Sequence, residues 1–130
     1  MTTLAGGELF DFGYVDNVGE TARFQHPTGL AVARGKLLVA DTYNHAVREV
    51  DPESGEVTTL VGQRLEAERH GDGRGEPGFL NGPLEAARLC EPTGLAAWQD
   101  RIVFVADSGN HAIRAIDLQS KEVGTLRLQL

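Results

Sequence analysis

An internal repeat constrains this sequence more than any other feature. Residues 27–31 read PTGLA, and the same five residues return at 92–96, a spacing of 65 positions. Further along, 39–41 (VAD) match 105–107, and the spacing has become 66 because one residue is added in a predicted turn. A chain made of two copies of one unit is typical of repeat architectures, in which neighbouring units bury a shared core.

Each copy predicts four short strands separated by turns. They are expected at 29–32, 36–40, 46–50 and 56–61, and again at 94–97, 102–106, 112–116 and 122–126. Hydrophobicity falls from the first strand to the fourth, which indicates a sheet with its first strand buried on both sides and its fourth strand outside. Four antiparallel strands ordered from inside to outside form one β-propeller blade. The fold class is therefore predicted as all-β, with two four-stranded antiparallel blades; a helical solenoid or an eight-stranded sandwich fits this duplication less well.

The blades divide the chain as one repeat unit, 1–130. Residues 2–6 (TTLAG) resemble the end of the first copy at 58–62 (TTLVG), so residues 1–6 are expected to form an outer strand of a preceding blade. The first blade with its lead-in loop is expected at 7–62, and the second blade with its lead-in loop at 63–130. The second lead-in carries a charged insertion of nine residues, which is expected to be an exposed excursion.

Charge and cysteine content exclude several functions. The chain has 19 acidic and 12 basic residues and a net charge of −7, so neither nucleic acid nor an anionic membrane surface is an expected partner. The single cysteine, Cys90, cannot form an internal disulfide and fits a reducing compartment. No apolar run approaches the roughly 20 residues of a membrane span, and no signal peptide is recognisable. We therefore expect a cytoplasmic location.

The repeated segments resemble a known family. Residues 24–32 and 38–51, and again 92–96 and 105–117, closely resemble the NHL repeat, including the Asn-His pair after Val-Ala-Asp. This resemblance implies a β-propeller, commonly of six blades, whose members scaffold protein contacts, bind RNA or carry enzymatic sites. It is closest to NHL modules found C-terminal to thioredoxin-like domains. A single cysteine leaves no Cys-x-x-Cys pair, so redox activity is not carried over.

Polar residues that recur in phase are predicted to be structural. A scaffold residue repeats with the unit, whereas a site residue is usually unique. Asp41 and Asp107 are expected to accept backbone N–H groups two residues on, in Asx-type turns. The histidines are expected to bridge carbonyls of adjacent strands, and Arg48 and Arg114 to pair with carboxylates. The predicted structural turn residues are Asp41, Asn44, His45, Asp107, Asn110 and His111.

Two residues at equivalent positions differ between the copies and are candidates for binding. His26 and Glu91 each directly precede the proline of an inner strand, a position expected at the mouth of a propeller channel. Cys90 is interpreted as a packing residue, since the neighbouring Glu91 disfavours a thiolate. The glycine-rich stretch 70–75 lacks the Lys-Ser/Thr of a phosphate loop and is expected to be a flexible loop. No catalytic residue, metal ligand or cofactor is predicted.

Two functions remain open at this level. The first is a non-catalytic binding or scaffolding module that contacts a protein or a ligand on the propeller face, or that acts through self-assembly. The second is a lyase or hydrolase with a metal ion in the central channel. Two blades alone leave sheet faces exposed. Two oligomeric states are therefore left open: a homotrimer that completes six blades and a monomeric fragment.

Overall fold

The first repeat forms one antiparallel sheet. The structure is a computed structural model of the chain that describes residues 2–8, 11–65 and 74–126. Its first sheet contains β1 (Pro27–Ala33), β2 (Lys36–Asp41), β3 (Ala46–Val50) and β4 (Val57–Val61), in that spatial order. Each strand pairs with its sequence neighbour, as expected when short turns connect consecutive strands.

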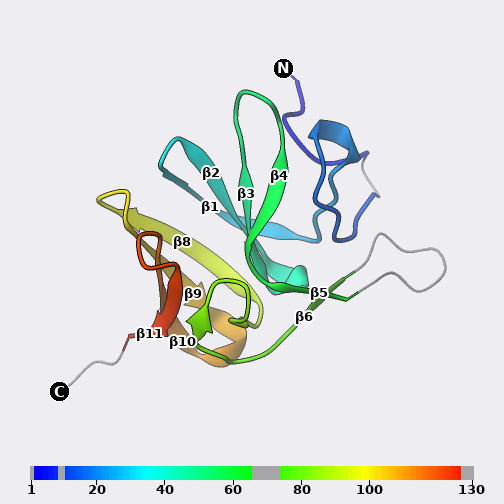
Figure 1. Cartoon of the computed structure of the whole chain (residues 1–130). Helices are drawn as coiled ribbons and strands as arrows, with labels where there is room; N and C mark the ends of the chain where they lie inside the picture. Colours follow the sequence, from blue (N-terminus) through cyan, green and yellow to red (C-terminus); the bar gives the residue numbers. More distant parts are fainter. Residues whose placement is uncertain (1, 9–10, 66–73, 127–130) are drawn as a thin grey trace.

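The second repeat forms the same sheet with one added strand. Its strands are β8 (Pro92–Trp98), β9 (Ile102–Asp107), β10 (Ala112–Asp117) and β11 (Glu122–Thr125). A two-residue strand from the lead-in, β7 (Gly82–Pro83), pairs with β11 at the outer edge. The order β7-β11-β10-β9-β8 places β8 at the opposite edge, beside β1 of the first sheet (Figure 1).

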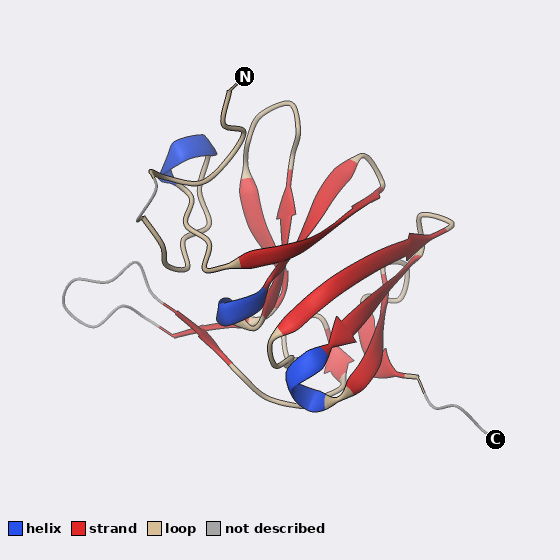
Figure 2. Cartoon of the chain, turned by 180° about the vertical axis from the view of Figure 1, so that it is seen from behind, coloured by secondary structure: helices blue, strands red, loops and turns tan. Residues whose placement is uncertain are grey.

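Short elements connect and flank the sheets. Strands β5 (Gln63–Leu65) and β6 (Arg74–Glu76) form a separate two-stranded ribbon. The described residues contain three 3-10 turns: η1 (Gly19–Thr21), η2 (Thr42–Asn44) and η3 (Ser108–Asn110). Figure 2 shows η2 and η3 at corresponding ends of the two sheets. The flanks of the expected excursion are therefore paired strands, while most of the glycine-rich stretch lies outside the described residues.

The main hydrophobic core lies between the two sheets. Side chains alternate between the faces of a strand, so each sheet presents one set of apolar residues to the other. From the first sheet come Ala33, Leu38, Val47 and Val61; from the second repeat come Ala87, Leu89, Val103, Val105, Ile116 and Val123. Removal of this surface from water supplies the main attraction between the repeats.

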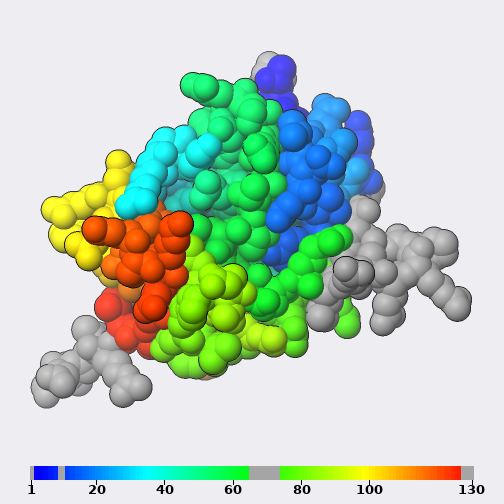
Figure 3. Space-filling model, viewed as in Figure 1, coloured from blue at the N-terminus to red at the C-terminus, as the bar shows by residue number. Residues whose placement is uncertain are grey.

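A smaller core lies on the far face of the first sheet. There Val39, Val50 and Val57 pack with Ala22, and Ala5 and Phe24 pack against them. The N-terminal segment therefore covers this face of the sheet, as the blue surface in Figure 3 shows. A matching lead-in covers the second sheet, because Leu80 bridges Arg88 as Val15 bridges Arg23.

The predicted fold is confirmed, with one correction. All eight expected strands are present, in two four-stranded antiparallel arrangements. However, the prediction that the first strand of each copy is buried on both faces is wrong. Leu30 and Val32 of β1 are 68% and 63% exposed, because β8 covers one face of β1 and the N-terminal segment leaves the inner end of its other face open.

Candidate functional site

Asp41 lies at the centre of a fully buried polar network in the first repeat. It ends β2, and its Oδ2 accepts hydrogen bonds from Asn44 Nδ2 at 2.8 Å and from Arg48 Nη1 at 2.7 Å. Its Oδ1 accepts the backbone N–H of Gln25 at 2.7 Å. All three side chains of this network, Asp41, Asn44 and Arg48, have 0% exposure. The carboxylate therefore joins the turn, the third strand and the lead-in segment.

The second repeat contains the same network. Asp107 Oδ2 accepts hydrogen bonds from Asn110 Nδ2 at 2.8 Å and from Arg114 Nη1 at 2.7 Å. Asp107 Oδ1 accepts the N–H of Cys90 at 2.7 Å. The predicted pairing of both arginines with carboxylates is confirmed. The predicted Asx-type bond is wrong: neither Asp caps its own turn, and each accepts an N–H from the lead-in segment that precedes its inner strand.

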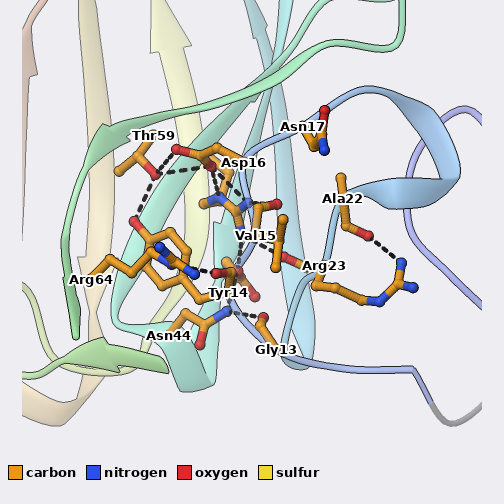
Figure 4. A network of polar contacts seen from close by, with 12 residues as sticks. Gly13, Tyr14, Val15, Asp16, Asn17, Ala22, Arg23, Asn44, Thr59 and Arg64 are labelled. Carbon is orange, nitrogen blue, oxygen red and sulfur yellow. Dashed lines mark hydrogen bonds and ion pairs between the residues drawn. The ribbon is translucent and has the colours of Figure 1, made fainter. Parts of the chain in front are cut away.

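The complete burial of both arginine side chains was not predicted from the sequence. Arg48 and Arg114 are among the largest fully buried side chains. The Arg48 guanidinium carbon lies 4.5 Å from the Tyr14 ring centroid and 4.8 Å from that of Phe24, so aromatic faces replace water around the charge. Figure 4 shows how the surrounding network also includes Asp16, Thr59 and the carbonyl of Val15. The strand pattern could have indicated this burial, because Arg48 alternates in phase with Val50 and therefore lies on a covered face of β3.

Tyr14 connects the first network to the linker strand β5. Its hydroxyl hydrogen-bonds Thr59 Oγ1 at 2.7 Å, and burial raises the pKa of Tyr14, which keeps the phenol neutral. Arg64 Nε donates to the Tyr14 carbonyl at 2.6 Å. On the other side of the ribbon, a Cβ added to Gly75 would lie 1.5 Å from the Asn44 carbonyl oxygen. The β5–β6 ribbon therefore lies directly against the Asn44 turn.

His45 connects the two repeats. It has a left-handed backbone, with φ of 54°, and its Nδ1 accepts the backbone N–H of Glu91 at 3.0 Å. It thus accepts a hydrogen bond from the next repeat, whereas the sequence led us to expect it to bridge carbonyls. Burial lowers the pKa of His45, although the charges of Glu91 and Asp107 oppose this effect. The equivalent His111 is exposed, and no hydrogen bond to its ring is found in the described part of the chain.

The two binding candidates lie at corresponding ends of the sheets. His26 precedes β1 and Glu91 precedes β8, both with left-handed backbones, at φ of 63° and 49°. The His26 ring stacks on the exposed Tyr43 ring, with centroids 4.8 Å apart and planes inclined by 20°. Tyr43 belongs to η2, so these residues lie where the inner strand starts and the second strand ends. We call this end, with His26, Tyr43, His45, Glu91 and His111, the 3-10 rim.

The described residues contain little that resembles a catalytic or metal centre. Among them, no group of three or more His, Cys, Asp or Glu side chains is placed to hold a metal ion. Burial raises the pKa of the Cys90 thiol, and the charges of Glu91 and Asp107 raise it further. Cys90 packs closely against η3: a Cβ added to Gly109 would lie 2.5 Å from its Sγ. This geometry agrees with a packing role.

Comparison with solved structures identifies the fold class. An auxiliary nutrient binding protein from Bacteroides thetaiotaomicron superposes with a TM-score of 0.68 at 24% identity, over 95% of this chain and 28% of that protein. A putative phosphatase from the same organism superposes with a TM-score of 0.66 at 23% identity, over 96% of this chain and 26% of its own. At these identities the likeness concerns the fold. With the blade-like sheets, it defines a β-propeller-type repeat protein.

Sequence comparison then identifies the family. The NHL repeat model matches residues 24–49 and 89–116. Protein SUPPRESSOR OF QUENCHING 1, chloroplastic, of Arabidopsis thaliana is 38% identical over 97% of this chain. NHL repeat-containing protein 2 of Homo sapiens is 37% identical over 95% of it. The chain carries two NHL repeats and belongs to the NHL-repeat proteins.

The chain is short beside these relatives. It spans 12% of the Arabidopsis protein and 17% of the human protein. Their whole-protein activities therefore do not transfer directly. In the described part of this chain, no helix has the length and apolar character required to span a bilayer.

Proposed function

We propose that this chain is a non-catalytic binding module in which the NHL scaffold presents the 3-10 rim to a partner protein. The observation that carries the proposal is a division between repeated and unique residues. The recurring pairs Asp41–Arg48 and Asp107–Arg114 are buried and hold the two blades together. Residues that differ at equivalent positions, His26 against Glu91 and Tyr43 against Gly109, lie exposed on the rim.

The chemistry of the rim suits recognition. His26 and Tyr43 form a stacked pair whose exposed ring surfaces are available to apolar or cationic groups of a partner. Glu91 adds a carboxylate, and its backbone N–H is held by a hydrogen bond to His45 Nδ1. Both candidates directly precede a strand, His26 before β1 and Glu91 before β8, so the sheets fix their backbone positions. A rim fixed in this way loses little conformational freedom on binding.

One of the similar proteins supports a binding role, while another is named a putative phosphatase. One solved structure with the same fold is called an auxiliary nutrient binding protein, so in that protein the name assigns a binding role. We extend the role to this chain as part of the proposal. The cytoplasmic location expected from composition remains a prediction, and one relative is chloroplastic.

The test is comparative affinity capture followed by quantitative mass spectrometry. The immobilised chain is compared with a His26→Ala/Tyr43→Ala variant and with a matched Gln119→Ala/Ser120→Ala control. The control residues are exposed in the turn between β10 and β11, at the opposite end of the sheet from η3. We expect a set of proteins to be lost with the rim variant and retained with the control. Identical capture by all three proteins would contradict the proposal.

A further inference from the structure

The contact between the two repeats is a complete example of how one blade receives the next. One close backbone approach and two hydrogen bonds accompany the apolar core. Gly29 approaches the Thr93 carbonyl so closely that an added Cβ would lie 2.5 Å from it. Thr42 Oγ1 donates to the Pro92 carbonyl at 2.8 Å, and His45 Nδ1 accepts the Glu91 N–H. The first sheet thus offers a small residue, a hydroxyl and an imidazole to the start of the following inner strand.

The outer face of the second sheet offers the same features, and no other sheet of the described residues packs against it. Gly94 takes the place of Gly29, and an added Cβ there would meet only the Ala106 side chain, at 3.6 Å. Ser108 and His111 take the places of Thr42 and His45 and are exposed. Apolar residues surround a pocket of about 360 Å³ on this face: Trp98, Ile102, Phe104, Ala115 and Leu126. Ile113, in the place of Val47, is 46% exposed.

The far face of the first sheet offers the complementary surface. A pocket of about 330 Å³ is lined there by Phe24, Leu30, Leu37, Val39 and Val50, among other residues. Their counterparts in the second repeat are Leu89, Leu95, Val103, Val105 and Ile116, which pack against Leu38 and Val47 in the main core. The chain therefore carries both sides of its own internal interface on its two open faces. We call the outer face of the second sheet the knobs and the far face of the first sheet the socket.

We propose that the partner of each open face is a second copy of this chain, docked head to tail. The outer face of the second sheet in one copy packs into the far face of the first sheet in the next copy. His111 Nδ1 accepts the N–H of His26, which has the left-handed backbone of Glu91 in the internal interface. This inference rests on the proposed reading of the chain as a scaffolding module. Repeated rotation about such a heterologous contact gives a closed ring, and three copies supply six blades.

The N-terminal segment defines the outer limit of this contact. Leu4 and Ala5 line the socket, and the Gly6 N–H donates to the Gly19 carbonyl at 3.1 Å. In the internal interface the corresponding place belongs to Leu60 and Val61 of β4. The outer part of the socket is thus already filled from within the chain. The docking copy fills the inner part, where Leu30 and Val32 are exposed, and its Leu126, the counterpart of Leu60, stays outside the contact.

Two charge substitutions separate the faces. Leu30→Asp disables the socket and leaves the knobs intact, whereas Ile113→Asp disables the knobs and leaves the socket intact. Val18→Asp is the matched control, because Val18 is 51% exposed and lies outside both faces. Light scattering and sedimentation velocity give the mass of each protein, and circular dichroism checks that each remains folded. If an Asp variant unfolds, Leu30→Ser or Ile113→Ser replaces it.

We expect the wild-type chain and the control to show a mass that rises with concentration from 14.0 kDa toward about 42 kDa, three copies of the 14.0-kDa chain. Each variant alone should stay at 14.0 kDa. Their equimolar mixture should form a dimer of about 28 kDa, twice 14.0 kDa, and nothing larger, because each mixed pair has a single working contact.

A wild-type chain that stays at 14.0 kDa at every concentration overturns the docking. So does a mixture that stays monomeric, or either variant assembling as the wild type does. The rim residues are unchanged in these variants, so partner capture is measured independently. A monomeric chain that retains rim-dependent capture would refute the docking and leave the proposed function in place.

Discussion

The two buried arginines occupy equivalent positions but have different partners. Arg48 contacts two carboxylates, Asp41 at 2.7 Å and Asp16 at 2.8 Å. Arg114 contacts one carboxylate, Asp107 at 2.7 Å, and its second partner is the side-chain oxygen of Asn81 at 2.7 Å. Arg48 Nε donates to Asp16, whereas Arg114 Nε has no hydrogen-bond partner in the described structure. The repeat thus preserves the buried anchor and varies the partner nearer to solvent.

The aromatic covers differ in the same way. Tyr14 is 1% exposed above Arg48, while Phe79, which lies 4.6 Å from the Arg114 guanidinium carbon, is 53% exposed. The difference arises from the β5–β6 ribbon, which reaches Tyr14 through Arg64. The β5–β6 ribbon therefore covers the first network, and the second repeat has no such ribbon in the described residues. A local addition to one repeat changes how deeply a shared structural pair is buried.

The largest expected effect is the loss of one buried carboxylate. Asp107→Ala should lower the free energy of unfolding by about 3–5 kcal/mol, because Arg114 is left buried without any carboxylate. Asp41→Ala should cost less, about 2–3 kcal/mol, because Arg48 keeps Asp16. Urea unfolding measures both. Glu53→Ala, at an exposed turn position, is the control, and an equal cost for the two aspartates would contradict the comparison.

A second prediction concerns displacement of the β5–β6 ribbon from the first network. Gly75→Ala places a Cβ against the Asn44 carbonyl, so the ribbon must move away from the turn. We expect a loss of about 1–3 kcal/mol in unfolding free energy and faster amide exchange at residue 75. Gly124→Ala is the control, since nothing lies within 4 Å of a Cβ added there. Similar stability for both variants would show that the ribbon does not support the network.

The outer partners can be exchanged between the repeats. Asp16→Asn should lower the unfolding free energy and Asn81→Asp should raise it, each by about 0.5–1 kcal/mol, since a half-exposed ion pair is partly screened by solvent. The Asp16 side chain is 39% exposed. Denaturation at low and high salt measures the change and its screening. Changes of the same sign in both variants would refute the idea that this position tunes the arginine.

The smallest expected effect concerns pH. Because the pKa of His45 is lowered in the folded state from its usual 6.5, its contribution to stability is complete above that value. This contribution is lost as the pH falls through the folded pKa, when Nδ1 can no longer accept the Glu91 N–H. His45→Asn, which tolerates the left-handed backbone, should flatten this part of the stability profile. A stability profile of the His45→Asn variant with the same pH dependence as the wild type would contradict the assignment.

Sequence patterns predicted the fold because the information is local and repeated. The spacing of PTGLA and VAD determined the strand positions to within a few residues, and the turns contain residues that suit them. The exposed inner strand was not predicted, because burial of Leu30 depends on what covers a sheet face rather than on the strand itself. A hydrophobicity gradient cannot report that a face has no neighbour.

The site was only partly predictable. Recurrence in phase distinguished Asp41 from unique residues in the sequence, but no local pattern shows that its carboxylate reaches Gln25, 16 positions earlier. The stack of His26 on Tyr43 also joins positions whose relation depends on the turn geometry at η2. The flanks of the linker insertion pair as β5 and β6 through contacts with the Asn44 turn, and such tertiary contacts leave no period in the sequence.

The central claim is that the repeated aspartate–arginine pair is a buried structural anchor rather than a binding site. A double-mutant cycle on Asp107→Ala and Arg114→Ala tests this claim most directly, with unfolding free energies measured in urea. The account predicts a coupling of about 2–3 kcal/mol, because each single variant strands a buried charged partner that the double variant removes. Additive effects within about 0.5 kcal/mol, together with loss of partner capture in a stably folded Asp107→Ala protein, would contradict it.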